Sequence, residues 1–113
     1  MNIKGLPKTL NICGFKYKIE YTTDTIKTDI FKRDSIYGQI DYVTRTMRIY
    51  IGDKKRLQKT EIINTILHEM IHGITTQNPL LEKVLGKDEE LFTSTFALLL
   101  TDTLIRNNLI NIK

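Results

Sequence analysis

Residues 60–76, TEIINTILHEMIHGITT, decide the fold because their apolar residues recur at the spacing of an amphipathic α-helix. Thr60 is placed to cap this helix, and Glu61 follows in its first turn. A helix of this kind buries its apolar side in the core and leaves the opposite side to a cleft. The predicted apolar face consists of Ile62, Ile63, Ile66, Leu67, Met70, Ile71 and Ile74.

The opposite side of the helix carries the pentapeptide His68-Glu69-Met70-Ile71-His72, which contains the only two histidines of the chain. Residues four apart stand one turn above each other, so both imidazoles can hold one metal ion. Glu69 lies about 60° round the helix axis from His72, beside the metal but outside its ligand set. The HExxH pattern therefore predicts metal-activated hydrolysis, with His68 and His72 as ligands and Glu69 as the general base.

A catalytic zinc usually has three protein ligands, and the chain has no third histidine. Glu61 shares the histidine face but lies about 10 Å along the helix from His68, too far to reach the same ion. Cys13 is the only cysteine and lies far upstream, so a thiolate ligand has weak support. Glu89 and Glu90 remain as candidates for the third ligand. From the residues alone, either carboxylate could reach the metal or simply belong to an acidic helix start.

A second long helix is predicted from Asp88 to about Asn107. Its large apolar residues form two lines, so we expect this helix to be largely buried. Glu90 shares a stripe of small side chains that would let the HExxH helix approach closely, whereas Glu89 lies along the line of Phe92. The two lines are Phe92, Phe96, Leu99, Leu100 and Leu104, and Leu91, Leu98 and Ile105; the stripe is Thr93, Ser94, Ala97 and Thr101.

The residues before the HExxH helix predict a small antiparallel or mixed sheet. Residues 14–22 alternate apolar and charged side chains, as in a strand with one solvated face. Residues 10–13 are a candidate partner strand, with a turn at Gly14. Residues 37–42 and 46–51 form a predicted hairpin, although no Asn-Gly or Asp-Gly pair marks its turn. We therefore expect an α+β fold, with the sheet packed against the HExxH helix and a long C-terminal helix.

HExxH followed by a helix that begins Glu-x-x-small-small-x-Phe-Ala resembles the gluzincin metallopeptidases, in particular small phage-encoded and ImmA/IrrE-like members. The matching stretch is ELFTSTFA, residues 90–97, and the resemblance spans residues 37–104. It implies a zincin-like fold, Zn²⁺ as the cofactor and Glu90 as the third ligand. It also implies that the residue four positions after Glu90 orients a ligand histidine. The family has Asn or Asp there, whereas this chain has the uncharged Ser94.

The resemblance also implies an activity, the hydrolysis of peptide bonds in a protein substrate in the cytoplasm, which is the host cytoplasm for a phage-encoded protein. ImmA/IrrE-like relatives act on DNA-binding repressors, so the implied substrate is a transcriptional regulator. The strand before the HExxH helix, residues 47–51, would pair with an extended substrate, unless it is an ordinary interior strand. Tyr37, Tyr42 and Tyr50 are unranked candidates for stabilising the oxyanion. The alternative function is a binding or regulatory module that keeps the fold without catalysis.

Length and composition predict a single domain, residues 1–113, whose hydrophobic content of 41% is enough for a core. The chain has no run of 18 apolar residues and no apolar segment after its first residues, so neither a membrane span nor a signal peptide is expected. One cysteine cannot form an internal disulfide, which agrees with a reducing compartment.

The net charge of +4 includes a basic cluster just before the HExxH helix. Without interleaved aromatic residues or a DNA-reading motif, this cluster favours a solvated loop over a nucleic-acid site. Residues 23–34 and 77–87 are the expected flexible spans, the second with a helical turn or lid at 80–85. The cluster consists of Lys54, Lys55, Arg56 and Lys59.

Overall fold

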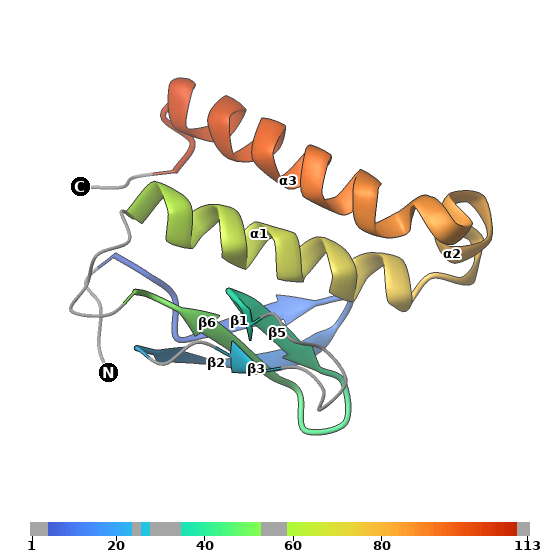
Figure 1. The fold of residues 1–113 in the computed structure, drawn as a ribbon, viewed down its shortest axis with the longest axis horizontal. Helices are drawn as coiled ribbons and strands as arrows, with labels where there is room; N and C mark the ends of the chain where they lie inside the picture. The colour runs from blue at the N-terminus through green and yellow to red at the C-terminus, as the bar shows by residue number, and fades with distance from the viewer. Residues whose placement is uncertain (1–4, 24–25, 28–34, 53–58, 111–113) are drawn as a thin grey trace.

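The computed structural model describes residues 5–23, 26–27, 35–52 and 59–110. The elements are β1 (Thr9–Ile12), β2 (Phe15–Thr22), β3 (Ile26–Lys27), β4 (Ser35–Ile36), β5 (Gly38–Asp41), β6 (Thr46–Tyr50), α1 (Lys59–Thr76), α2 (Pro79–Leu85), the 3-10 helix η2 (Gly86–Asp88) and α3 (Glu89–Arg106). Helix α1 lies between a four-stranded sheet and α3, which packs on α1 rather than mainly on the sheet (Figure 1). The predicted α+β class is confirmed, with a mixed sheet.

Strands β1 and β2 form the predicted N-terminal hairpin, in which Ile12 pairs with Phe15. The two residues of its turn, Cys13 and Gly14, have φ values of 52° and 87°. Two positive φ values in a two-residue turn match the twist of the flanking strands. The Asn11 side chain also accepts a hydrogen bond from the Gly14 N–H at 3.0 Å. The predicted partner strand and its turn are therefore confirmed.

Strands β5 and β6 form the second predicted hairpin, with Asp41 opposite Thr46. The Asp41 carboxylate closes the turn, since its Oδ1 accepts hydrogen bonds from the N–H groups of Val43 and Thr44 at 2.9 and 3.2 Å. Arg45 supplies a left-handed residue, with φ 54°. An Asx-type turn thus replaces the Asn-Gly pair that the sequence lacks, and the predicted hairpin is confirmed.

The two hairpins join through a parallel pairing of β2 with β6, so the strand order is β1-β2-β6-β5. Strand β6 is therefore interior, with β2 on one side and β5 on the other. The expectation that residues 47–51 receive an extended substrate is wrong, because both backbone edges of this strand are already paired. Among the described strands of this sheet, β1 and β5 form the edges.

The hydrophobic core lies between the sheet and α1. The predicted apolar face of α1 is buried at Ile62, Ile63, Ile66 and Ile71, whereas Ile74, in the last turn, is 40% exposed. Helix α1 begins at Lys59, so Thr60 lies within the first turn instead of capping it. The buried residues that pack together are Ile12, Tyr17, Ile19, Met47, Ile49, Ile51, Ile62 and Ile66.

A short helix, α2, occupies most of the span predicted to be flexible at 77–87. Asn78 caps it by accepting a hydrogen bond from the Leu81 N–H at 3.0 Å, and Pro79 opens the first turn. The expected helical turn at 80–85 is therefore present. Most of residues 23–34 and three residues of the basic cluster, Lys54, Lys55 and Arg56, lie outside the described residues. None of the helices described is long and apolar enough to cross a membrane.

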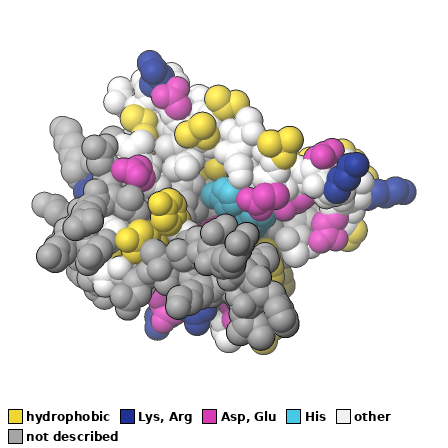
Figure 2. All heavy atoms as spheres, in the orientation of Figure 1, with side chains coloured by type: hydrophobic (Ala, Val, Ile, Leu, Met, Phe, Trp, Pro, Cys, Tyr) yellow, Lys and Arg dark blue, Asp and Glu magenta, His cyan; other side chains and the backbone are white. Residues whose placement is uncertain are grey.

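The expectation that α3 is largely buried is wrong. Within α3 only the small residues Thr93, Ala97 and Thr101 are buried, and they face α1. One neighbouring helix covers one stripe of α3, and small side chains allow the close approach, so the larger apolar residues are left facing outward. Hydrophobic side chains accordingly appear on the surface over α3 (Figure 2). The most exposed are Leu91, Leu98 and Leu99, at 69%, 61% and 60%, followed by Phe96 and Phe92 at 43% and 38%.

Candidate metal centre

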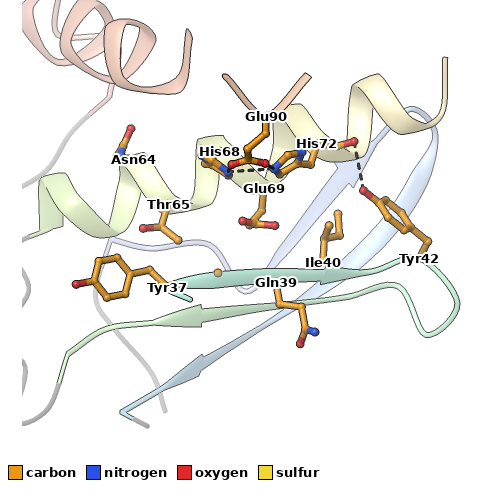
Figure 3. Close-up of a pocket in the computed structure, with 11 residues that line it drawn as sticks. Tyr37, Gln39, Ile40, Tyr42, Asn64, Thr65, His68, Glu69, His72 and Glu90 are labelled. Carbon is orange, nitrogen blue, oxygen red and sulfur yellow. Dashed lines mark hydrogen bonds and ion pairs between the residues drawn. The ribbon is translucent and has the colours of Figure 1, made fainter. Parts of the chain in front are cut away.

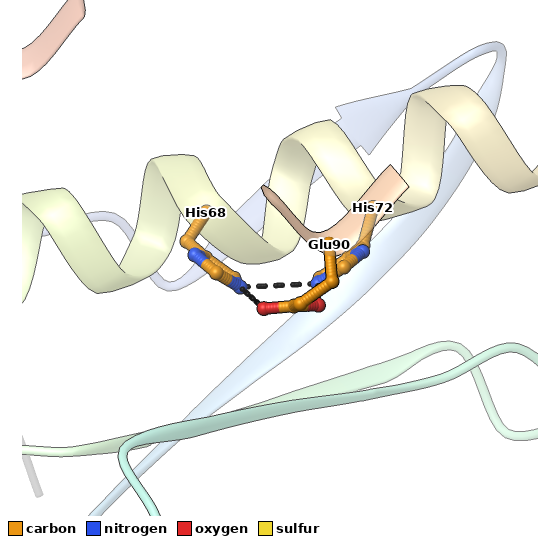
Figure 4. A group of neighbouring side chains, drawn as sticks. All are labelled: His68, His72 and Glu90. Atoms are coloured by element: carbon orange, nitrogen blue, oxygen red, sulfur yellow. Dashed lines mark hydrogen bonds and ion pairs between the residues drawn. The ribbon is translucent and has the colours of Figure 1, made fainter. Parts of the chain in front are cut away.

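The two histidines of the HExxH motif and Glu90 converge from two helices. His68 and His72 stand one turn apart on α1, and their Nε2 atoms are 3.0 Å from each other. Glu90 reaches across from the first turn of α3, with Oε1 3.2 Å from His68 Nε2 and Oε2 2.9 Å from His72 Nε2 (Figure 4). The structure thus brings together the three residues predicted as ligands. Cys13 and Glu61 are not in this group.

The spacing of these donor atoms fits a small cation. Zn–N and Zn–O bonds of about 2.0–2.2 Å place tetrahedral ligand atoms about 3.3 Å apart, close to the three separations found here. The His68 and His72 side chains are 22% and 17% exposed, while Glu90 is 67% exposed, so one side of the group stays open to solvent. The histidines are visible at the surface beside acidic side chains (Figure 2). A structural zinc site is normally closed, whereas a catalytic one keeps an open position.

The electrostatics of His68 favour the form that binds metal. Burial lowers the pKa of its imidazole, and the neighbouring His72 lowers the pKa further, while Glu90 acts in the opposite direction. The net shift keeps His68 neutral over a wider pH range. A metal ligand must be a neutral imidazole, so the pocket prepares His68 for coordination.

Glu89 lies behind His72 and not among the converging donor atoms. Its Oε2 is 2.9 Å from His72 Nδ1 and accepts hydrogen bonds from the hydroxyls of Thr75 and Thr93 at 2.9 and 2.7 Å. Of the two carboxylates left open by the sequence, the structure therefore places Glu90 with the Nε2 atoms and Glu89 on the far side of His72. Successive residues in a helix turn point about 100° apart, which explains why the two carboxylates approach opposite sides of one ring.

The role expected for Ser94 is not found. Its hydroxyl donates a hydrogen bond to Glu90 Oε1 at 3.2 Å and contacts neither histidine within hydrogen-bond distance. The physical reason is the length of the Ser94 side chain. Ser94 lies one turn after Glu90 on α3, and its short side chain extends only as far as the Glu90 carboxylate. The carboxylate that contacts Nδ1 of His72 is that of Glu89, one residue before Glu90 in the chain.

Glu69 is buried, with 7% of its surface exposed, and points from α1 towards β5 (Figure 3). Burial raises the pKa of its carboxyl from 4.5 to about 7; the charge of His72 lowers this pKa, and Glu90 and Glu89 raise it. A carboxyl that ionises near neutral pH beside a candidate metal site is suited to accept and release a proton.

A cleft of about 790 Å³ runs between α1 and β5 and is lined by His68, His72, Glu90 and Glu69 (Figure 3). Tyr37 and Tyr42 line this cleft, but Tyr50 does not; its ring stacks on that of Tyr37 at 5.5 Å. The Tyr42 hydroxyl donates to the backbone oxygen of His72 at 3.3 Å and is 3.1 Å from Thr76 Oγ1. Two of the three tyrosines considered as oxyanion donors, Tyr37 and Tyr42, therefore lie at the cleft.

Several residues that line the cleft were not predicted from the sequence. Asn64 and Thr65 stand one helical turn before His68 and Glu69, so the period of α1 could have identified them. Gly38, Gln39 and Ile40 belong to β5, and their place opposite the motif depends on strand order, for which the sequence has no local signal. Two further cleft residues, Tyr37 and Tyr42, flank β5 and are among the three tyrosines considered from the sequence.

Gly38 allows the close approach of β5 to the side of α1 that carries Thr65 and Glu69. A Cβ atom at this position would lie 2.8 Å from Thr65 Cγ2 and 2.9 Å from Glu69 Cγ. We expect Gly38→Ala to destabilise the protein by about 1–3 kcal/mol through overpacking. Urea unfolding measures the change, with Gln39→Ala as the control on the same strand. Because Thr65→Ser removes the nearer methyl group, the double variant should recover part of the loss, and equal stability of Gly38→Ala and the parent protein would contradict this packing.

The raised pKa of Glu69 predicts how the stability of the metal-free protein depends on pH. A buried carboxyl with a raised pKa favours folding fully below about pH 4.5, and this contribution is lost as the pH rises through about 7. In chelator, Glu69→Gln should therefore be more stable than the parent near pH 8 by on the order of 2 kcal/mol, and the advantage should shrink near pH 5. Urea unfolding of both proteins at the two pH values tests this; an advantage that does not change with pH counts against a buried, ionising Glu69.

Comparisons of the chain with protein-family models, with curated proteins and with solved structures find no match. Membership of the gluzincin group therefore stays a prediction made from residues 68–72 and 90–97. The functional proposal rests on the residues of the cleft and on the chemistry that their side chains allow.

Proposed function

We propose that this protein is a zinc-dependent metallopeptidase, with His68, His72 and Glu90 holding the metal and Glu69 as the general base. The observation that carries the proposal is the convergence of three ligand atoms from α1 and α3 in an open cleft that also contains Glu69. When bound, zinc would polarise the scissile carbonyl and acidify a coordinated water. The same ligand set would also accept Mn, Co, Ni or Fe(II), and zinc is proposed on ligand type and spacing.

In this proposal Glu69 moves the protons. Its carboxylate accepts a proton from the attacking water and passes it to the leaving amine. The side chain points into the cleft between α1 and β5, and Gly38 leaves room for it there (Figure 3). Because its pKa is raised to about 7 by burial, the carboxyl can both take up and release a proton near neutral pH.

The proposed substrate is an extended segment of a protein. Strand β5 lies along the cleft and, among the described strands of its sheet, pairs only with β6. Its outer backbone edge is therefore the one that an extended peptide would use, in place of the interior strand β6. We further propose a transcriptional regulator as the substrate and the cytoplasm, or the host cytoplasm, as the compartment. The gluzincin resemblance supports both proposals, and the single cysteine agrees with a reducing compartment.

The second candidate function is a binding or regulatory module on the same scaffold. The observation that favours it is the outward apolar side of α3, where Leu91, Leu98 and Leu99 are each at least 60% exposed. Exposed apolar patches on soluble proteins often mark contact sites. Glu69 favours the enzyme, because a site that only binds has no chemical need for a buried carboxyl beside its ligands. Loss of activity on Glu69→Gln would separate the two candidates.

Metal content is the first test of the proposal. We expect about one equivalent of zinc in protein purified without a chelator or a histidine tag, measured by plasma mass spectrometry. Glu90→Ala should lower zinc affinity by roughly 100-fold or more because it removes one of three protein ligands. Glu82→Ala is the matched control, because it also changes a glutamate to alanine but at an exposed position of α2 outside the cleft, and it should retain zinc. Absence of zinc from the parent protein after zinc is added back would reject the metallopeptidase and leave the binding module.

A further inference from the structure

We propose that Glu89 is a positioning residue that fixes the ring of His72, with the proton on Nδ1 and the Nε2 lone pair turned to the metal. The inference concerns the orientation of one ligand and rests on the proposed zinc site for its functional meaning. It assigns to Glu89 the role that the gluzincin resemblance implies for position 94.

One carboxylate oxygen, Oε2 of Glu89, makes the contacts that support this role. Glu89 Oε2 is within hydrogen-bond distance of three groups, His72 Nδ1 at 2.9 Å and the hydroxyls of Thr75 at 2.9 Å and Thr93 at 2.7 Å. A carboxylate faces each ring nitrogen of His72, Glu89 at Nδ1 and Glu90 at Nε2, both at 2.9 Å. If Nε2, on the side where His68 and Glu90 converge, gives its lone pair to the metal, the hydrogen of the neutral ring must be on Nδ1, where the Glu89 carboxylate can only accept it.

Two threonine hydroxyls hold the Glu89 carboxylate in place. Thr75 and Thr93 both donate hydrogen bonds to its Oε2, at 2.9 and 2.7 Å. The two threonines come from different helices, Thr75 from α1 and Thr93 from α3, so the carboxylate is fixed from both sides of the helix pair. A carboxylate fixed in this way can set the angle of the imidazole as well as its tautomer.

The two histidines differ in this respect. Within the described residues, no hydrogen bond is found to Nδ1 of His68, whereas Nδ1 of His72 faces Glu89. The adjacent residues Glu89 and Glu90 therefore lie on either side of one imidazole, with Oε2 of each 2.9 Å from Nδ1 and Nε2 respectively. Position 94, where the gluzincin resemblance implies Asn or Asp, holds a serine that contacts Glu90. The ring of His72 is thus fixed through Glu89 and not through position 94.

Nuclear magnetic resonance can read the tautomer directly, because the chain has only two histidines. Long-range ¹H–¹⁵N spectra are recorded on metal-free Glu90→Ala at mildly alkaline pH, because in this variant no Glu90 carboxylate faces Nε2. His72 should carry its proton on Nδ1, assigned by comparison with the same variant carrying His68→Ala. In this background Glu89→Ala should lose the preference, whereas Glu89→Gln, whose amide oxygen can still accept the hydrogen, should retain much of it. A His72 with its proton on Nε2 while Glu89 is present, or a spectrum that Glu89→Ala leaves unchanged, would overturn the proposal.

Zinc affinity, measured by competition with a chromophoric chelator, gives the second readout. Loss of a carboxylate that orients a ligand histidine typically costs 10–100-fold in metal affinity, which we expect for Glu89→Ala, with a smaller loss for Glu89→Gln. Glu82→Ala, which removes an exposed glutamate on α2 outside the cleft, should stay within about threefold of the parent. Unchanged affinity in both Glu89 variants would reject the role. If the parent binds no zinc, the proposed function fails, and the tautomer spectrum still decides whether Glu89 orients His72.

Discussion

Glu69→Gln is expected to lower the rate of peptide hydrolysis by about 10²–10⁴-fold, the usual contribution of a general base. Glutamine is isosteric with glutamate and fits the same space beside Gly38, but its amide cannot take a proton from the attacking water. His68, His72 and Glu90 are unchanged in this variant, so zinc should stay bound at one equivalent. Loss of rate with retention of metal would assign Glu69 to the chemical step.

Digestion of a peptide library, read by mass spectrometry, measures this prediction even though the natural substrate is unidentified. Glu61→Gln is the matched control, because it changes a glutamate to glutamine in the first turn of the same helix, outside the cleft. Its rate should equal that of the parent. A Glu69→Gln protein that cleaves as fast as the parent would remove Glu69 from the mechanism, and a parallel loss of zinc would show that the substitution acts on the metal site.

Removal of the metal should destabilise the protein by about 4 kcal/mol relative to a solution with zinc at 1,000 times its dissociation constant. The expected fall in Tm is on the order of 10–20 °C for a domain of this size. Zinc would join α1, through His68 and His72, to α3, through Glu90. Helix α3 contributes no side chain to the main buried cluster and contacts α1 mostly through small residues, so this connection should matter.

Thermal unfolding followed by circular dichroism, with zinc and with chelator, measures the effect. His68→Ala is the control, because its Tm should no longer respond to zinc. Hydrogen exchange can locate the change, and chelation should speed exchange in α3 more than in the β2–β6 pair. A parent protein with the same Tm in zinc and in chelator would contradict the proposed link between the two helices.

The sequence predicted best what depends on local pattern. The helical period of residues 60–76 identified α1, and the alternation in residues 14–22 identified β2. The HExxH spacing predicted that His68 and His72 lie together, because residues in successive helical turns keep a fixed spacing. Glu90 was chosen over Glu89 through the gluzincin resemblance, and the structure brings it to the same two histidines. That these residues bind zinc and hydrolyse peptides stays a prediction.

What could not be predicted depends on contacts between distant segments. No local feature of residues 46–50 shows that β2 pairs beside them, so β6 could not be identified as interior. The apolar lines of α3 resemble those of a buried helix, and only the packing on α1 shows which stripe is covered. Glu89, and not Ser94, contacts His72, because hydrogen bonding depends on the reach of each side chain across the helix pair, which spacing along one helix does not determine.

The parallel seam between β2 and β6 bears on the order of folding. Both hairpins close short loops, which takes microseconds, whereas the seam pairs Lys18 with Thr46 and must bring distant parts of the chain together. The pairing of β2 with β6 buries Ile19 beside Met47 and joins the two hairpins into the sheet against which α1 packs. Substitutions at this seam should therefore slow refolding more than equally destabilising changes in either turn. The residues that pair β2 with β6, none of which lines the cleft, would then determine how soon the cleft forms during folding.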